Sequence, residues 1–111
     1  MRKYRLGIFA EYLVLLLYKM CFYNILHHRM KTCVGEVDLV ASRFKELVFI
    51  EVKARKSGIY EGIVSLSQQE RIKKAAMLFL SKNTKYENHN IRFDLVVLRP
   101  YRLPIIIKNA W

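Results

Sequence analysis

Three side chains on two neighbouring apolar segments could act together on a phosphodiester bond. Asp38 lies in the segment 35–40, and Glu51 and Lys53 lie in the segment 49–53. Both segments have the composition of buried strands, where a carboxylate is costly unless a cation neutralises it. The lysine is one such cation, and a divalent metal ion would be another. Two carboxylates and an ammonium group held together predict metal-assisted hydrolysis.

The spacing of these residues predicts that they share one pocket. Side chains alternate across a strand, so Glu51 and Lys53 lie on the same face, about 7 Å apart. If Ser42 or Arg43 pairs with the residue just past the turn of a hairpin, Asp38 lies opposite Glu51, with their Cβ atoms about 5 Å apart, and Glu36 lies opposite Lys53. A register shifted by two residues in either direction would still keep these four residues on the same face. Two carboxylates at that separation repel each other and raise one pKa, unless a divalent cation bridges them.

Mg²⁺ or Mn²⁺ is the cofactor that this pattern favours, because both ions bind hard oxygen ligands and retain several waters. Lys53 would orient the attacking water, hold a phosphate oxygen and stabilise the charge of the transition state. The alternative is a solvated strand face, on which a Glu–Lys pair contributes little energy. Because that spacing is common by itself, the metal-site hypothesis depends on the aspartate of the paired strand.

The elements that must position these residues follow from the apolar periodicity. Their order, α-β-β-β-α-β, predicts an α/β fold with a mixed sheet. Alternation within the first acidic segment also predicts one shared apolar face for Val37, Leu39 and Ala41. The expected elements are a helix over 3–20, strands over 22–29, 35–42 and 47–55, a helix from an N-cap at Ser67 to about Lys82 with a capping box completed by Glu70, a strand over 91–98, and an edge strand over 105–107.

Composition and charge limit the class of protein. The chain has 111 residues, 53% of them hydrophobic, which predicts a single domain over residues 1–111 and excludes a disordered tail. Its 20 Lys and Arg against 9 Asp and Glu give a formal net charge of +11. Such an excess favours a polyanionic partner, because each neutralised phosphate releases counterions. A basic composition without functional meaning is the alternative.

The cysteines and histidines do not show the spacing of a metal site. Cys21 and Cys33 form no CxxC pair, and we expect both to be reduced, buried and cytoplasmic. His27 and His28 are adjacent in a predicted strand, so they should point to opposite faces, which argues against a metal shared between them.

The apolar N-terminal segment resembles a signal peptide at first sight. Arg5 and Glu11 interrupt it, and the stretch 12–18 is far shorter than the ~20 residues that span a bilayer. We therefore expect a helix of a cytoplasmic domain that has no membrane partner.

Motifs along nearly the whole chain resemble one known pattern, that of the bacterial YraN-like family. This family is similar to archaeal Holliday-junction resolvases and to the PD-(D/E)xK, restriction-endonuclease-like superfamily. The resemblance implies a three-layer core of a helix, a three-stranded meander, a helix and a further strand. Asp94 matches the family pattern, but we expect it to be structural, bonded to Arg92 or to a neighbouring backbone group. The motifs are Gly7 with Ala10-Glu11, the segments 35–40 and 49–55, Ala75-Ala76 with Leu80, Arg92-Phe93-Asp94, and Asn109-Ala110-Trp111.

The resemblance implies a role for five residues. Asp38 and Glu51 correspond to metal ligands, and Lys53 corresponds to the catalytic lysine. Glu11 would be the acidic residue of the first helix that completes the metal site, although a carboxylate paired with Lys or Arg at the helix edge is the alternative. Gln68 stands where the family usually has a lysine. It is expected to act in catalysis, with a solvent-facing cap residue as the alternative.

The function expected from these residues is a metal-dependent endonuclease acting on DNA, including branched or structured DNA, since no base-reading motif is visible. A homodimer is expected by analogy, because two strands need two cuts. One alternative is a catalytically inactive nucleic-acid-binding protein of the same fold, and another is a scaffold for protein partners. The residues expected to bind phosphates are Lys31, Arg43, Lys45, Arg55, Lys56, Arg71, Lys73 and Lys74; those of the second helix are equally consistent with a solvated face.

Overall fold

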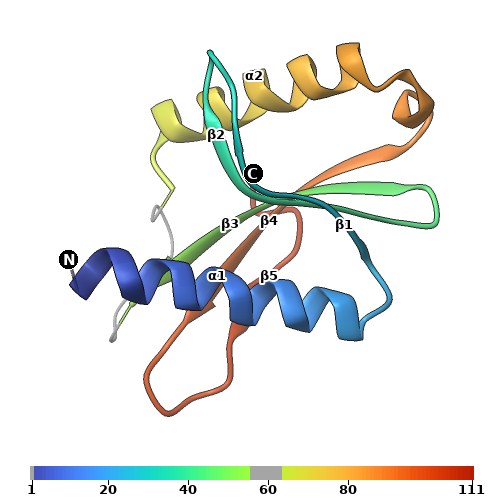
Figure 1. Cartoon of the computed structure of the whole chain (residues 1–111). Helices are drawn as coiled ribbons and strands as arrows, with labels where there is room; N and C mark the ends of the chain where they lie inside the picture. Colours follow the sequence, from blue (N-terminus) through green and yellow to red (C-terminus); the bar gives the residue numbers. More distant parts are fainter. Residues whose placement is uncertain (1, 56–63) are drawn as a thin grey trace.

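Two helices cover opposite faces of one five-stranded sheet (Figure 1). The computed structural model describes residues 2–55 and 64–111, and it describes the side chains of the first helix from Phe9 onward. None of the described helices is long and apolar enough to cross a bilayer. The elements are α1 (Arg2–Met20), β1 (Asn24–Lys31), β2 (Glu36–Arg43), β3 (Glu46–Ala54), α2 (Leu66–Lys82), the 3₁₀ helix η1 (Thr84–Tyr86), β4 (Asn90–Leu98) and β5 (Ile105–Ile107).

The sheet is mixed, with the strands in chain order from β1 to β5. β3 and β4 are parallel, and the other three neighbouring pairs are antiparallel. A parallel pair needs a crossover connection, and α2 lies within the one that joins β3 to β4. The predicted α/β class, its order of elements and its layered core are confirmed. The edge strand that was expected near the C-terminus is β5.

Each face of the sheet buries its apolar side chains under one helix. Phe49 of β3 packs under α2 with Phe79, and the two rings meet edge to face. On the other face, Leu39 and Ile50 pack under α1 with Val14. Because the middle of β3 is covered on both faces, it is a continuous apolar run rather than an alternating one. A charged residue at the end of such a run is therefore held by a rigid support.

The start of α2 differs from the prediction. The N-cap is Ser65, whose hydroxyl accepts a hydrogen bond from the backbone N–H of Gln68, at 3.1 Å. Ser65 has the extended backbone (φ −64°, ψ 158°) that an N-cap requires, whereas Ser67 is already in the first helical turn. The predicted cap at Ser67 and its capping box with Glu70 are therefore wrong. The predicted loop before the helix falls largely on residues 56–63, outside the described residues.

The cysteines are exposed, contrary to expectation. Cys21 lies in the turn after α1, and Cys33 lies in the turn between β1 and β2; both are free thiols. Turns lie at the surface because their backbone groups need water, and the small cysteine side chains are carried there with them. The predicted burial of both residues is therefore wrong.

Asp94 has the structural role that was expected of it. Its side chain is fully buried and accepts hydrogen bonds from the Tyr18 hydroxyl (2.8 Å), the Arg92 guanidinium (2.9 Å) and the backbone N–H of Asn109 (3.1 Å). Burial and the neighbouring charge of Asp94 raise the pKa of Tyr18 well above its ordinary value. The carboxylate thus ties α1 and the C-terminal segment to β4.

Candidate active site

A bend in the β1–β2 hairpin shapes the site. Arg29 has a φ of 60°, in the left-handed region that is uncommon for residues other than glycine. Met30 and Val37, which pair across the hairpin, pack under α2, whereas Leu39 packs under α1. Val37 and Leu39 would share a face in a regular strand, so their predicted common face is wrong and alternation breaks at Asp38. Beyond this bend the tip of the hairpin turns towards α2 (Figure 1).

Asp38 lies where β2 and β3 separate. Their ladder ends at the pair Leu39 and Ile50, in the predicted register, so the next opposed pair would be Asp38 and Glu51. At this point the Asp38 carboxylate accepts a hydrogen bond from the backbone N–H of Val52, at 2.8 Å. The carboxylate therefore takes the place of a backbone carbonyl of the neighbouring strand as the acceptor for this N–H group. This bond fixes Asp38 against β3, beside Glu51.

Glu51 is a buried acid, with a residue exposure of only 6%. Gln68 of α2 donates a hydrogen bond from Nε2 to its Oε2, at 2.9 Å. Burial, a hydrogen bond with Asp38 and the negative charge of Asp38 raise the pKa of Glu51 to about 9, against the opposing charge of Lys53. The structure thus brings Asp38, Glu51, Lys53 and Gln68 together at one end of the sheet.

Glu11 joins this group from α1. Its Oε1 lies 3.2 Å from Nε2 of His28 and 3.5 Å from Nε of Arg29. Burial and the negative charge of Asp38 raise the pKa of Glu11, whereas Arg29 and His28 act in the opposite direction. Glu11 is therefore paired with a cation, as one alternative expected, and is also coupled electrostatically to Asp38.

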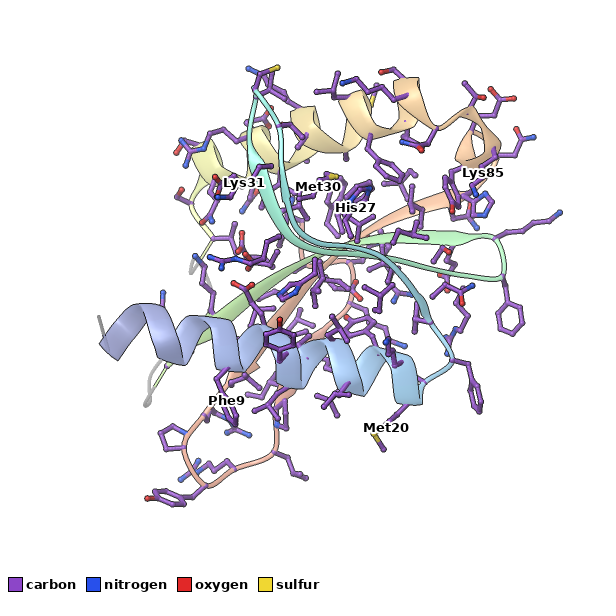
Figure 2. All side chains as sticks on the ribbon, in the orientation of Figure 1. Phe9, Met20, His27, Met30, Lys31 and Lys85 are labelled. Atoms are coloured by element: carbon purple, nitrogen blue, oxygen red, sulfur yellow. The ribbon has the colours of Figure 1, made fainter. Side chains whose placement is uncertain are left out.

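Sequence reasoning missed the part played by His28 and Arg29. The two histidines do point to opposite faces, as predicted. The His27 ring meets Phe79 on the side of α2 (Figure 2), whereas His28 contacts Glu11 of α1. The register would have revealed His28, because it pairs with Leu39, next to the acidic residue 38. Nothing in the sequence indicated the position of Arg29, because an arginine gives no sign that its backbone is left-handed.

The carboxylates fit a divalent cation only in part. Asp38 and Glu51 offer two hard oxygen ligands, and Mg²⁺ commonly uses one or two carboxylates and keeps several waters. A cation there would offset the repulsion and the burial that raise the pKa of Glu51. Among residues 2–55 and 64–111, however, no three His, Cys, Asp or Glu residues are grouped closely enough to bind a metal. Glu11 is thus close enough to interact electrostatically with Asp38, but it does not form a three-residue metal site with Asp38 and Glu51 in this structure.

Glu36 belongs to a neighbouring cavity instead of the carboxylate site. It is exposed and pairs with Lys31 across the hairpin, so the predicted opposition of Glu36 and Lys53 is not formed in the β2–β3 ladder. With Gln68 and Arg71 it lines a cavity of about 430 Å³ between the β1–β2 turn and the first turns of α2. Gln68 therefore lies between this cavity and Glu51.

The basic residues expected to bind phosphates lie at different places. Lys31, Arg55 and Arg71 lie at the end of the sheet that carries the carboxylates, and Figure 2 shows Lys31 near the start of α2. Lys73 and Lys74 are exposed on α2. Lys56 lies outside the described residues.

Arg43 and Lys45 lie at the other end of the β2–β3 hairpin. Five residues separate Asp38 from Arg43 along β2, which corresponds to about 17 Å. The Arg43 guanidinium donates a hydrogen bond to the carbonyl of Cys21, at 2.9 Å, and lies 4.3 Å from the ring centroid of Tyr23. Arg43 therefore has a structural role beside any contact that it makes with a phosphate.

Fold and site together define an α/β domain in which a buried glutamate, a half-buried aspartate and a lysine lie at the open end of a bent hairpin. The chain belongs to the Uncharacterised protein family UPF0102, whose model matches residues 10–98. This is the YraN-like family that the motifs resemble, so that prediction is confirmed.

The similarity to members of this family extends over most of their length. The chain is 40% identical to a UPF0102 protein of Chelativorans sp. (strain BNC1), over 99% of this chain and 90% of the relative. It is 38% identical to one of Parvibaculum lavamentivorans, over 97% and 82%, and 40% identical to one of Ehrlichia chaffeensis, over 95% and 85%. Membership does not assign a reaction, so the function has to be argued from the site.

Proposed function

We propose that this protein is a metal-dependent endonuclease that hydrolyses phosphodiester bonds in DNA, with branched or otherwise structured DNA as its substrate. The observation that carries the proposal is the buried Glu51 next to the half-buried Asp38, with Lys53 beside them. Burying Glu51 next to a second carboxylate costs free energy that an apolar residue of similar size would not cost. Strongly shifted pKa values of this kind gather at functional sites.

The residues of the site divide the chemistry among themselves. Asp38 and Glu51 would hold Mg²⁺ or Mn²⁺, with Glu11 nearby. Such an ion, when bound, lowers the pKa of a water molecule and stabilises charge on a phosphate. Lys53 would donate a hydrogen bond to a non-bridging phosphate oxygen and stabilise the negative charge that develops there. Gln68 would orient Glu51 through the hydrogen bond to its Oε2.

The charge of the chain supports a nucleic acid as the substrate. Its net charge is +11, and Lys31, Arg55 and Arg71 lie at the end of the sheet that holds the carboxylates. Contacts from such residues to phosphates position a duplex without reading its sequence. The substrate would therefore be selected by the shape of its backbone, as at a branch point.

Cleavage assays on purified protein test this proposal. A four-way DNA junction and a linear duplex of the same sequence are incubated with Mg²⁺, Mn²⁺ or EDTA. We expect metal-dependent cleavage that is faster on the junction and at least ~100-fold slower for Lys53→Ala, because one catalytic donor contributes about that much. Lys82→Ala is the matched control, since it removes the same charge from the exposed end of α2 and should keep the rate.

Two results would refute the proposal. If wild type cleaves no DNA or RNA with either metal but binds junctions tightly, the protein is the inactive nucleic-acid-binding alternative. If Lys53→Ala cleaves as fast as Lys82→Ala, the observed activity does not come from this site.

A further inference from the structure

The outer side of α1 is an apolar surface that the described residues leave uncovered. The inner side of this helix packs on the sheet through Val14 and Tyr18. A helix that is apolar all round is normally buried all round. The outer surface, which we name the α1 stripe, consists of Phe9, Tyr12, Leu13, Leu16 and Met20, each between 41% and 75% exposed. Tyr12 lies at its edge, where its ring also meets the His28 ring edge to face.

The α1 stripe has the shape and size of an interface. Its positions recur at helical spacing and form a straight band about 17 Å long, since a helix rises about 1.5 Å per residue. Phe9 and Met20 mark its two ends, and both lie on the side of α1 that is turned away from α2 (Figure 2). Large side chains present on the order of 200 Å² each when fully exposed, so the stripe presents on the order of 550 Å².

We infer that a second copy of this chain covers the α1 stripe, with the two α1 helices packed antiparallel about a two-fold axis. Two stripes would together bury on the order of 1,100 Å², just above the ~1,000 Å² that a specific interface needs. An interface about a two-fold axis uses the same patch on both copies, and a symmetric apolar band is self-complementary in this sense.

Charge also favours a second copy over a polyanion at this surface. The chain carries a net charge of +11, yet the five residues of the α1 stripe have no charge at all. DNA would gain nothing from this surface, because counterion release needs Lys or Arg. Two strongly basic copies repel each other, so a surface without cations is the one at which they meet at the lowest electrostatic cost. The α1 stripe is such a surface.

Dimerisation through this surface would leave the carboxylate site open. Glu11 lies about 150° around the helix from the centre of the α1 stripe, given a rotation of about 100° per residue. The inference does not depend on nuclease activity, because it rests on exposure and shape. If the proposed function also holds, the dimer would supply one site for each strand of a duplex.

The mass of the protein in solution tests the inference. Sedimentation equilibrium of the full chain should give twice the 13.2 kDa of one copy. Leu16→Asp should raise the dissociation constant of the dimer at least ~100-fold, because it places a charge at the centre of the interface. Met77→Asp is the matched control: Met77 is 67% exposed on α2, so the same change there should leave the dimer intact. Circular dichroism verifies that both variants fold.

Cysteine cross-linking tests the antiparallel arrangement. In a background carrying Cys21→Ser and Cys33→Ser, Leu13→Cys lies near the two-fold axis and should form a disulfide with its own copy. Met20→Cys should not cross-link to itself, but should do so when mixed with Phe9→Cys. A protein that stays monomeric at about 100 µM, or a dimer that Leu16→Asp leaves unchanged, would overturn the inference. Binding of a monomer to anionic phospholipid vesicles, lost in Leu16→Asp, would also overturn it and assign the stripe to a lipid surface.

Discussion

At the scale of single residues, Glu51 shows how the fold holds an acid in an unfavourable setting. Its neighbours are Gln68, which donates a hydrogen bond, and Asp38, which is another acid. Burial is the largest cause of its raised pKa, and the hydrogen bond with Asp38 and the charge of Asp38 come next. Each of these causes favours the protonated form of Glu51.

The raised pKa predicts how stability changes with pH in EDTA. The pKa of Glu51 is about 9 in the folded state and 4.5 without these interactions, so between these values the folded state binds more protons. The contribution of Glu51 is fully present below pH 4.5 and is lost as the pH rises towards 9. We expect it to fall by up to about 1.4 kcal/mol per pH unit in that window. Urea unfolding at successive pH values measures it.

Two variants isolate this effect. Glu51→Gln cannot titrate, so the difference in unfolding free energy between wild type and this variant should vary with pH as described. Glu70→Gln changes an exposed carboxylate of α2 and should follow wild type at every pH. A difference between wild type and Glu51→Gln that stays constant from pH 5 to 9 would contradict the prediction.

At the scale of elements, the sequence predicted the β2–β3 hairpin well because two requirements agreed. A register that keeps the acidic residues on one face also keeps the apolar residues on buried faces, and shifts by two residues would have met both requirements too. The structure has the unshifted register, in which Asp38 would lie opposite Glu51. The bend could not be predicted, because it depends on the left-handed backbone of Arg29, and no glycine or other turn residue stands there to indicate it. The cap of α2 was misplaced because Ser65 and Ser67 are equally good cap residues by type.

Gly35 holds the hairpin tip against α2 by its lack of a side chain. A Cβ atom there would lie 2.6 Å from the backbone carbonyl oxygen of Arg71, closer than real contacts allow. We expect Gly35→Ala to lower the free energy of unfolding by about 1–3 kcal/mol, because helix backbone cannot yield as a flexible side chain does. Chemical denaturation with urea measures the loss.

The neighbouring residue of the same turn supplies the control. Val34 is 37% exposed, so Val34→Ala should change stability by less than about 0.5 kcal/mol. The displaced hairpin tip should also loosen the first turns of α2 that carry Gln68. Amide hydrogen exchange in that turn should therefore be faster in Gly35→Ala than in Val34→Ala. Equal stability of the two alanine variants would show that the close contact is relieved without cost.

At the scale of the whole molecule, charge and apolar surface occupy separate places. The end of the sheet with the carboxylates also carries Lys31, Arg55 and Arg71, whereas the five residues of the α1 stripe carry no charge. Net charge could be taken from composition, and it indicates a polyanion without saying where it binds. The location of the binding surface required the structure. Sequence alone gives no reason to distinguish Arg43 from Arg71, and only their surroundings in the fold separate them.

That difference between two arginines gives a prediction for DNA binding. The logarithm of the binding constant should fall linearly with the logarithm of salt concentration, with a slope of about −0.9 for each phosphate neutralised. Arg71→Ala should make the slope shallower by about 0.9, because Arg71 is exposed beside the cavity at the start of α2. Arg43→Ala should keep the slope and lower stability instead, since its guanidinium is bonded to the Cys21 carbonyl. Fluorescence anisotropy with a labelled junction, in EDTA to prevent cleavage, measures the slopes; a slope that changes with Arg43 and not with Arg71 would place the DNA at the opposite end of the sheet.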